Sequence, residues 1–214
     1  MRPERELFTK AEIDLLCKAA VSSKPDGTPV AKNGRQFSDY LLLLACSGMR
    51  RREALALKWE DVDFEKRFLT VGRHRATKNK EIRRVKFNSD LESHLRSMWG
   101  RKAPDSVWIF PSPKRGDTDR PVIDFRATLD LAKAEAVKEC PKLASFKFHD
   151  TRHHFVSMAV MSGADFMSVA KWVGHRDGGI LIGSTYGHLS DQHQEEQADK
   201  VRFGPSSTHR EAMA

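Results

Sequence analysis

One short run of the sequence places a histidine and an arginine where they could bind an anion together. In KFHDTRHHF (residues 147–155), His149 and Arg152 are three residues apart, so on a helix they share one face. A guanidinium can hold two phosphate oxygens, and an imidazole can accept or donate a proton. We therefore consider this pair a candidate phosphate site.

A second candidate arginine, Arg50, follows the apolar run LLLLAC and the dipeptide Gly48-Met49, which puts its guanidinium at the edge of the expected core. Glu53 comes one helical turn later. The two side chains could form an ordinary structural ion pair, or the carboxylate could fix the guanidinium for phosphate binding. The sequence leaves both interpretations open.

A histidine and a tyrosine lie within the glycine-rich segment VGHRDGGILIGSTYGHL (residues 173–189). His175 follows an expected helix end, where it is either a C-terminal cap favoured by the helix dipole or a catalytic residue. Tyr186 is one of two tyrosines, and the other, Tyr40, lies in the apolar run FSDYLLLLAC and is expected in the core. No apolar periodicity requires an aromatic residue at position 186, so Tyr186 is either a packing residue or a nucleophile.

The polar segment HRATKNKE (residues 74–81) lies between two expected strands and suits the tip of a hairpin. A lysine at such a tip is usually solvated, but it could also contact a phosphate or donate a proton. We take Lys78 as the candidate and Lys80 as its rival.

Taken together, these candidates comprise one lysine, two arginines, two histidines and one tyrosine, a set that suits phosphodiester transesterification. A metal site is the alternative, because His149 and His153 have the i, i+4 spacing of a zinc pair. However, HDTRH lacks the glutamate of the HExxH motif, and no carboxylate-rich cluster stands nearby. We expect no metal or other cofactor, and helix packing and capping for His153 and His154.

The charge of the chain is consistent either with a polyanionic partner or with nothing more than a basic surface. The 214 residues carry a formal charge of +8 and a pI of about 9.5, which suggests nucleic acid first, an anionic membrane second, or simply a basic surface. The three cysteines lie far apart and form no CxxC pair, as expected for free thiols in a reducing compartment. No apolar run approaches the length of a membrane span, and the charged N-terminus lacks a signal core, so we expect a cytoplasmic protein.

The elements that must position these residues are mostly helical. Apolar periodicity predicts helices at residues 10–22, 36–47, 90–99, 122–138, 148–162 and 165–173, with a short one after Gly48. Alternating patterns within residues 61–72 and 82–87 predict short strands of a hairpin. The expected fold class is mainly α with a small antiparallel β-sheet (α+β).

With these motifs in place, the sequence resembles the catalytic domain of the tyrosine recombinases, or phage integrases. The resemblance rests on SGMRRREALALKWEDVDF, ATKNKEIRRVKF, FHDTRHHFVSMAVMSGADFMSVAKWVGH and STYGHL, and covers roughly residues 7–191. It implies a catalytic domain over residues 1–191, a polar C-terminal tail over residues 192–214, and an N-terminal core-binding domain absent from this chain.

The resemblance also implies a role for each candidate. Arg50 and Arg152 would clamp the scissile phosphate, and His175 would donate a hydrogen bond to it. Lys78 would protonate the leaving 5′-oxygen. His149 would help to deprotonate Tyr186, which would form a 3′-phosphotyrosyl link. Glu53 would buttress the site.

The function implied is site-specific recombination of double-stranded DNA, in integration or excision of a mobile element, by an enzyme that acts in the cytoplasm at the nucleoid of a prokaryote or its phage. Family members assemble as tetramers on DNA, while a lone domain could be a monomer in solution. The alternatives are relaxation of DNA in the manner of a type IB topoisomerase, and a non-catalytic DNA-binding accessory protein of the same fold.

Two positions depart from the family pattern. Thr151 stands where leucine is usual, a change expected to affect packing more than chemistry. The spacing from His175 to Tyr186 is a residue or two longer than in many members, through GGILIG. We therefore expect this segment to be a flexible tether and Tyr186 to be displaced from the arginines when no DNA is bound.

Overall fold

A computed structural model describes residues 7–74, 82–112 and 120–186 of the chain. Its elements, in chain order, are α1 (Lys10–Val21), α2 (Gly34–Ser47), α3 (Arg51–Leu55), a 3-10 turn (Trp59–Asp61), β1 (Val62–Asp63), β2 (Phe68–Val71), β3 (Arg83–Lys86), α4 (Ser89–Arg101), α5 (Arg126–Ala136), a second 3-10 turn (Pro141–Ser145), α6 (Phe148–Met161), α7 (Phe166–Val173) and α8 (Ile180–Tyr186). The predicted class, mainly α with a small antiparallel sheet, is confirmed.

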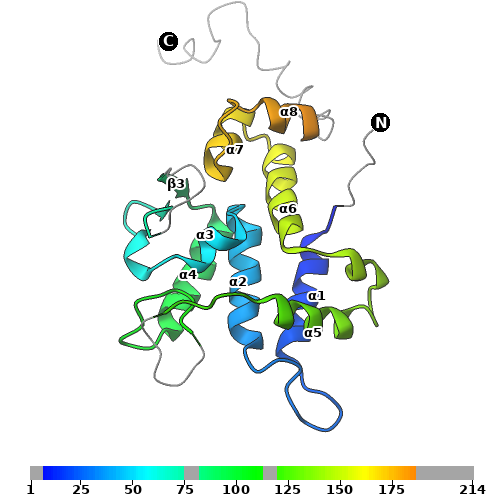
Figure 1. Cartoon of the computed structure of the whole chain (residues 1–214). Coiled ribbons are helices and arrows are strands. Elements are labelled where there is room, and N and C mark those ends of the chain that lie inside the picture. Colours follow the sequence, from blue (N-terminus) through cyan, green and yellow to red (C-terminus); the bar gives the residue numbers. More distant parts are fainter. Residues whose placement is uncertain (1–6, 75–81, 113–119, 187–214) are drawn as a thin grey trace, which may run out of the picture.

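The apolar helix α2 lies at the centre of the molecule and packs against α1, α4 and α6 (Figure 1). Glycines at both of its ends allow close approach. A Cβ on Gly34 would lie 1.9 Å from the carbonyl oxygen of Ala20, and a Cβ on Gly48 would lie 2.3 Å from the ring of Phe155. Gly48 also ends the helix in the left-handed region, at φ 63°, which favours glycine. The chain therefore turns out of the core directly before Arg50.

The three strands form one antiparallel sheet in the order β1-β2-β3. Leu69 of β2 pairs with Val85 of β3, and both are buried. Val71 pairs with Arg83, so Arg83 lies on the same inward face of β3 as Val85. The register thus places one arginine of this strand at the core side of the sheet.

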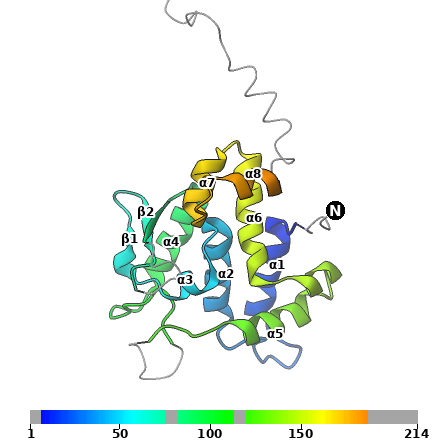
Figure 2. The same ribbon diagram turned by 45° about the horizontal axis from the view of Figure 1, so that its top comes forward.

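The buried apolar side chains form two clusters of unequal size. The large cluster joins α1, α2, α4, α5 and the sheet. The small cluster joins α6, α7 and α8, which lie together at one end of the molecule (Figure 2), and consists of Phe155, Val156, Val160, Val169, Ala170, Val173, Ile182 and Tyr186. Both clusters border the candidate site.

Two sequence predictions need correction. The helix expected at residues 122–138 begins at Arg126, because Val122 instead extends along the segment before Pro111 and its amide donates to Phe110. The expected tether contains a helix, since residues 180–186 form α8, whose Ile182 and Tyr186 bury themselves in the small cluster. No helix within the described ranges is long and apolar enough to cross a membrane.

Candidate active site

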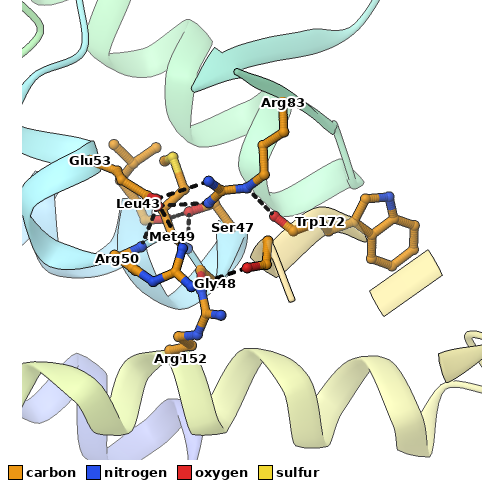
Figure 3. A network of polar contacts seen from close by, with 10 residues as sticks. Leu43, Ser47, Gly48, Met49, Arg50, Glu53, Arg83, Arg152 and Trp172 are labelled. Atoms are coloured by element: carbon orange, nitrogen blue, oxygen red, sulfur yellow. Dashed lines mark hydrogen bonds and ion pairs between the residues drawn. The ribbon is translucent and has the colours of Figure 1, made fainter. Parts of the chain in front are cut away.

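Arg50 and Glu53 form the ion pair that their spacing predicted, at the start of α3. Oε2 of Glu53 accepts the backbone N–H of Arg50 at 2.9 Å, and Oε1 accepts its Nη1 at 3.1 Å. The Glu53 side chain is only 5% exposed, whereas that of Arg50 is 48% exposed. The carboxylate is therefore an internal support, to which the half-exposed Arg50 is bonded (Figure 3).

Arg83 of β3 binds the same carboxylate. This residue was not identified from the sequence. Its Nη1 and Nη2 donate to Oε1 and Oε2 of Glu53 at 2.9 and 2.7 Å. Burial alone would raise the pKa of Glu53, but the hydrogen bonds and charges of Arg83 and Arg50 hold it below its ordinary value. An arginine at an inward strand position in IRRVKF was the signal that could have found this residue.

The C-terminus of α7 lies against both arginines. Arg50 donates from Nη2 to the carbonyl of Gly174 at 3.1 Å, and Arg83 donates from Nε to the carbonyl of Trp172 at 2.9 Å. Gly174 is left-handed, at φ 71°, and a Cβ there would lie 3.2 Å from the Arg83 guanidinium. The arginines thus satisfy carbonyls that a helix end leaves without intrahelical partners.

His175 is the next residue, so its position at a helix end is confirmed. Its amide donates to the carbonyl of Ala170 at 2.8 Å, while its buried Nδ1 has no hydrogen-bond partner within the described part of the chain. Burial lowers the pKa of His175, and the positive charges of Arg152 and Arg50 lower it further. The imidazole is therefore mainly neutral at neutral pH, with a buried nitrogen that a ligand could engage.

Arg152 approaches the same place from α6, as Figure 3 shows. Its side chain is buried, and Nη1 donates to the carbonyl of Gly48 at 2.8 Å. Nη2 is buried without a partner among the residues that the structure describes. Burial lowers the pKa of Arg152 to about 9, and the charges of Arg50 and Arg83 contribute, so the group remains a cation at neutral pH. A buried, incompletely bonded cation of this kind is suited to receive an anion.

A pocket of about 650 Å³ opens beside these residues and brings Arg50, His149 and Arg152 together. Arginines and lysines make up seven of its thirteen lining residues; the others besides His149 are one acid, Asp130, and the apolar Met49, Leu129, Phe146 and Phe148. His175 does not line the pocket, but it lies close enough for the charges of Arg152, Arg50 and His149 to lower the pKa of its imidazole. Four of the predicted site residues therefore converge.

Tyr186 ends α8 and is only 8% exposed. Its hydroxyl shares a hydrogen bond with Nδ1 of His153, the residue after Arg152, and its phenol acts electrostatically on Arg152. The flexible tether that we expected is wrong, because residues 180–186 form the helix α8, which places the Tyr186 hydroxyl on His153 of α6. The displacement of Tyr186 from the arginines stays a prediction. The small cluster offers enough apolar surface to dock this segment, which local glycine content alone did not indicate.

The predictions for the other residues of α6, and for the two candidate lysines, have mixed outcomes. His153 contacts Tyr186 and packs edge-on against His149 at 4.7 Å between ring centroids, so packing and capping do not describe it fully. His154 is structural as predicted, since its Nδ1 donates to the carbonyl of Phe8 at 2.9 Å. Thr151 is buried and bonds to the carbonyl of Phe148, a packing role. Lys78 and Lys80 lie outside the described residues.

The fold and this site define a class: a mainly helical protein in which arginines and histidines form a basic site, with a buried tyrosine hydrogen-bonded to the residue that follows Arg152 on α6. A model of the phage integrase family matches residues 7–193. The chain therefore belongs to the phage integrase family.

Individual relatives agree with this assignment. The chain is 25% identical over 165 residues to tyrosine recombinase XerA of Pyrococcus furiosus, which covers 76% of this chain and 54% of the relative. It is 30% identical over 174 residues to tyrosine recombinase XerC of Xanthomonas campestris, covering 79% and 48%. For the ICEBs1 integrase of Bacillus subtilis the identity is 27% over 193 residues, covering 77% and 48%. The chain thus spans about half the length of the curated relatives it matches.

Solved structures share the fold. The Tn1549 transposon integrase, in complex with circular intermediate DNA, superposes with a TM-score of 0.69 at 15% identity, covering 94% of this chain and 68% of that one. The catalytic domain of bacteriophage HP1 integrase superposes with a TM-score of 0.59 at 22% identity, covering 95% of this chain and 98% of that one. Nearly the whole described fold therefore corresponds to that catalytic domain.

Proposed function

We propose that this chain is the catalytic part of a site-specific DNA recombinase, which breaks and rejoins DNA strands during integration or excision of a mobile element. One observation carries the proposal: the buried Nη2 of Arg152 and Nδ1 of His175, both without partners among the described residues, lie at a basic site beside Tyr186. Two unused hydrogen-bonding groups in a cationic setting suit the oxygens of a phosphodiester.

In the proposed reaction the hydroxyl oxygen of Tyr186 attacks the scissile phosphorus, and the bond from phosphorus to the 5′-oxygen breaks. Arg50 and Arg152 neutralise the non-bridging oxygens as negative charge accumulates, and His175 hydrogen-bonds to one of them. The product is a 3′-phosphotyrosyl link and a 5′-hydroxyl. Attack of a 5′-hydroxyl on this link restores the diester and frees the tyrosine, so no cofactor is consumed.

Two further groups move protons in this scheme. His149 helps to remove the proton from Tyr186. The Tyr186 hydroxyl is hydrogen-bonded to His153, whose ring packs against that of His149, so the phenol starts close to its proposed base. Lys78 protonates the leaving 5′-oxygen, an assignment that rests on its motif. A free tyrosine has a pKa near 10, so the surrounding cations are needed to make it a nucleophile at neutral pH.

Double-stranded DNA is the proposed partner, with self-association into a tetramer on DNA, and the proposed site of action is the nucleoid in the cytoplasm. The basic wall of the pocket supports the DNA assignment, because its lysines and arginines offer contacts to phosphates next to the scissile one. Binding should therefore weaken steeply as the salt concentration rises.

Covalent capture tests the proposal directly. The protein is incubated with a randomised library of nicked duplexes, which trap the cleaved intermediate, and adducts that survive denaturation are isolated and sequenced. The wild type and Tyr40→Phe, which changes the other tyrosine, should form adducts on a common sequence. Tyr186→Phe should form none.

Each other outcome has a definite meaning. An adduct with the Tyr186→Phe variant would show that the nucleophile is wrongly assigned. Adducts without any sequence preference, with relaxation of supercoiled DNA, would indicate topoisomerase-like activity instead. DNA binding without adducts would indicate an accessory protein.

A further inference from the structure

Arg83 commits all three of its guanidinium nitrogens to interactions inside the protein. Two donate to the Glu53 carboxylate at 2.9 and 2.7 Å, and Nε donates to the carbonyl of Trp172 at 2.9 Å. Its side chain is 12% exposed, against 48% for Arg50. Arg83 is therefore not presented to a ligand; it connects β3 to α3 and to the end of α7 (Figure 3).

The charges in this cluster have a direct consequence for Arg50. Two guanidiniums share the one carboxylate of Glu53, so the cluster keeps a net positive charge. If a neutral residue replaced Arg83, the charges of Glu53 and Arg50 would form a one-to-one pair. The negative charge of Glu53 would then cancel much of the attraction of Arg50 for an anion. Arg83 thus lets Glu53 orient Arg50 without neutralising it.

The same cluster positions the end of α7 that precedes His175. Arg83 binds the carbonyl of Trp172 and Arg50 binds that of Gly174, so two cations cap the negative end of this helix. The left-handed Gly174 leaves room for the Arg83 guanidinium, which a Cβ would approach to 3.2 Å. A disturbance at Arg83 would therefore be transmitted to two groups on different elements, Arg50 and His175.

From these contacts we propose that Arg83 is a positioning residue, which acts through Glu53 and the C-terminus of α7 to hold Arg50 and His175 towards one phosphate. The nature of that phosphate, in DNA, rests on the proposed function. The arrangement needs an arginine, because a lysine ammonium carries the charge but lacks the planar fork that serves Glu53 and Trp172 together.

The test compares Arg83→Gln and Arg83→Lys with Arg84→Gln, a matched control on the next, outward-facing position of β3. The rate of adduct formation is measured in a single turnover with saturating DNA, alongside DNA affinity and thermal unfolding. Losing a direct transition-state donor costs about 10²- to 10³-fold, so Arg83→Gln should slow the reaction by about 10- to 100-fold. Arg83→Lys should recover part of the rate, and Arg84→Gln should react like the wild type.

A double-mutant cycle with Glu53→Gln separates positioning from general destabilisation. Because Arg83 acts partly through Glu53, Arg83→Gln should slow the reaction by a clearly smaller factor once Glu53 is neutral; the part that remains comes from the lost bond to the Trp172 carbonyl at the end of α7. Multiplying effects of the two changes, or a wild-type rate for Arg83→Gln, would overturn the proposal. So would a loss of rate explained entirely by the unfolded fraction; if Arg83→Gln does not fold, the same comparison is made with Arg83→Lys.

Hydrogen exchange supplies a readout that needs no DNA. The amides of Gly174 and His175, which bond to Lys171 and Ala170, should exchange at least about tenfold faster in Arg83→Gln, with the amides of α2 unchanged. Unchanged exchange at Gly174 and His175 would refute the inference whatever the activity. Faster exchange in a protein whose wild type forms no adduct would instead refute the proposed function and leave the role of Arg83 standing.

Discussion

The two sides of the candidate site are held by different kinds of interaction. On one side, Arg50, Glu53 and Arg83 form charged hydrogen bonds between elements that border the large core. On the other, Tyr186 is held by the small cluster and by its hydrogen bond to His153, at the end of the seven-residue helix α8. The groups that would bind phosphate are more firmly placed than the group that would attack it.

This difference has a mechanistic meaning. A short helix with few apolar contacts can open locally at a lower free-energy cost than the large core can. Opening of α8 would release Tyr186 from His153 while leaving Arg50 and Arg152 in place. The nucleophile could then enter a site whose phosphate-binding groups are already arranged.

The largest expected effect is on the phosphate-binding side. Arg152→Met keeps most of the side-chain volume but removes a buried cation whose Nη2 is unused among the described residues. We expect adduct formation to slow by about 10²- to 10³-fold. Thermal stability should change little, because relief from the charges of Arg50 and Arg83 offsets the lost hydrogen bond to the carbonyl of Gly48. Arg96, an exposed arginine of α4 that pairs with Glu92, supplies the control change Arg96→Met. A wild-type rate for Arg152→Met would contradict the role of Arg152.

Next in size is a change that targets the tyrosine side alone. A Cβ on Gly179, at φ 103°, would lie 2.8 Å from backbone atoms of Phe166, whereas one on Gly178, at φ 65°, would meet no described atom within 4 Å. Gly179→Ala should weaken the docking of α8 by about 2 to 3 kcal/mol, and Gly178→Ala by about 1 kcal/mol. Hydrogen exchange of the α8 amides measures both, and equal effects would show that the close approach to Phe166 is not what fixes α8.

Matched truncations in the two clusters sharpen the comparison. Val71 and Val169 are both fully buried, the first in the large cluster and the second in the small one. Each Val→Ala change should cost about 2 kcal/mol of local packing. Native-state hydrogen exchange should show Val71→Ala lowering the free energy of global unfolding, and Val169→Ala mainly that of opening α7 and α8. If both lower global unfolding alike, the two clusters form one cooperative unit.

The smallest effect expected is a dependence of stability on pH. Burial lowers the pKa of His154 and of His175, the latter also through the charge of Arg152. The unfolded chain, in which histidine has a pKa of about 6.5, therefore binds more protons than the folded one, so stability should fall as the pH drops from 7 to 5.5. Thermal unfolding over this range measures the slope, which His154→Gln should reduce; an unchanged slope would mean that His154 does not contribute.

Much of the fold was predictable because its elements carry local patterns. The apolar periodicity of α1, α2, α4 and α7 appears within each segment, and the i, i+3 spacing of Arg50 and Glu53 sets their contact within one helical turn. The start of α5 was misplaced because the apolar Val122 and Phe125 read as part of the helix, although Val122 is buried in extended backbone.

The parts that escaped prediction depend on partners distant in the sequence. Arg83 binds the carboxylate of Glu53, 30 positions away, and the carbonyl of Trp172, 89 positions away. The local sequence IRRVKF does not indicate either partner. Likewise Tyr186 meets His153 across 33 positions, and α8 forms where the small cluster can bury its apolar side chains.

The sequence by itself determined which side chains are candidates for the site: two arginines, two histidines, a lysine and a tyrosine, which lie in motifs of a known family on a basic chain. It also determined most of the helices, because their apolar periodicity is local. Only the tertiary structure decided how these groups are held. Arg83 rather than solvent balances Glu53, and a short helix rather than a loose tether carries Tyr186, because the burial of charge and of apolar surface is settled by elements that meet only after folding.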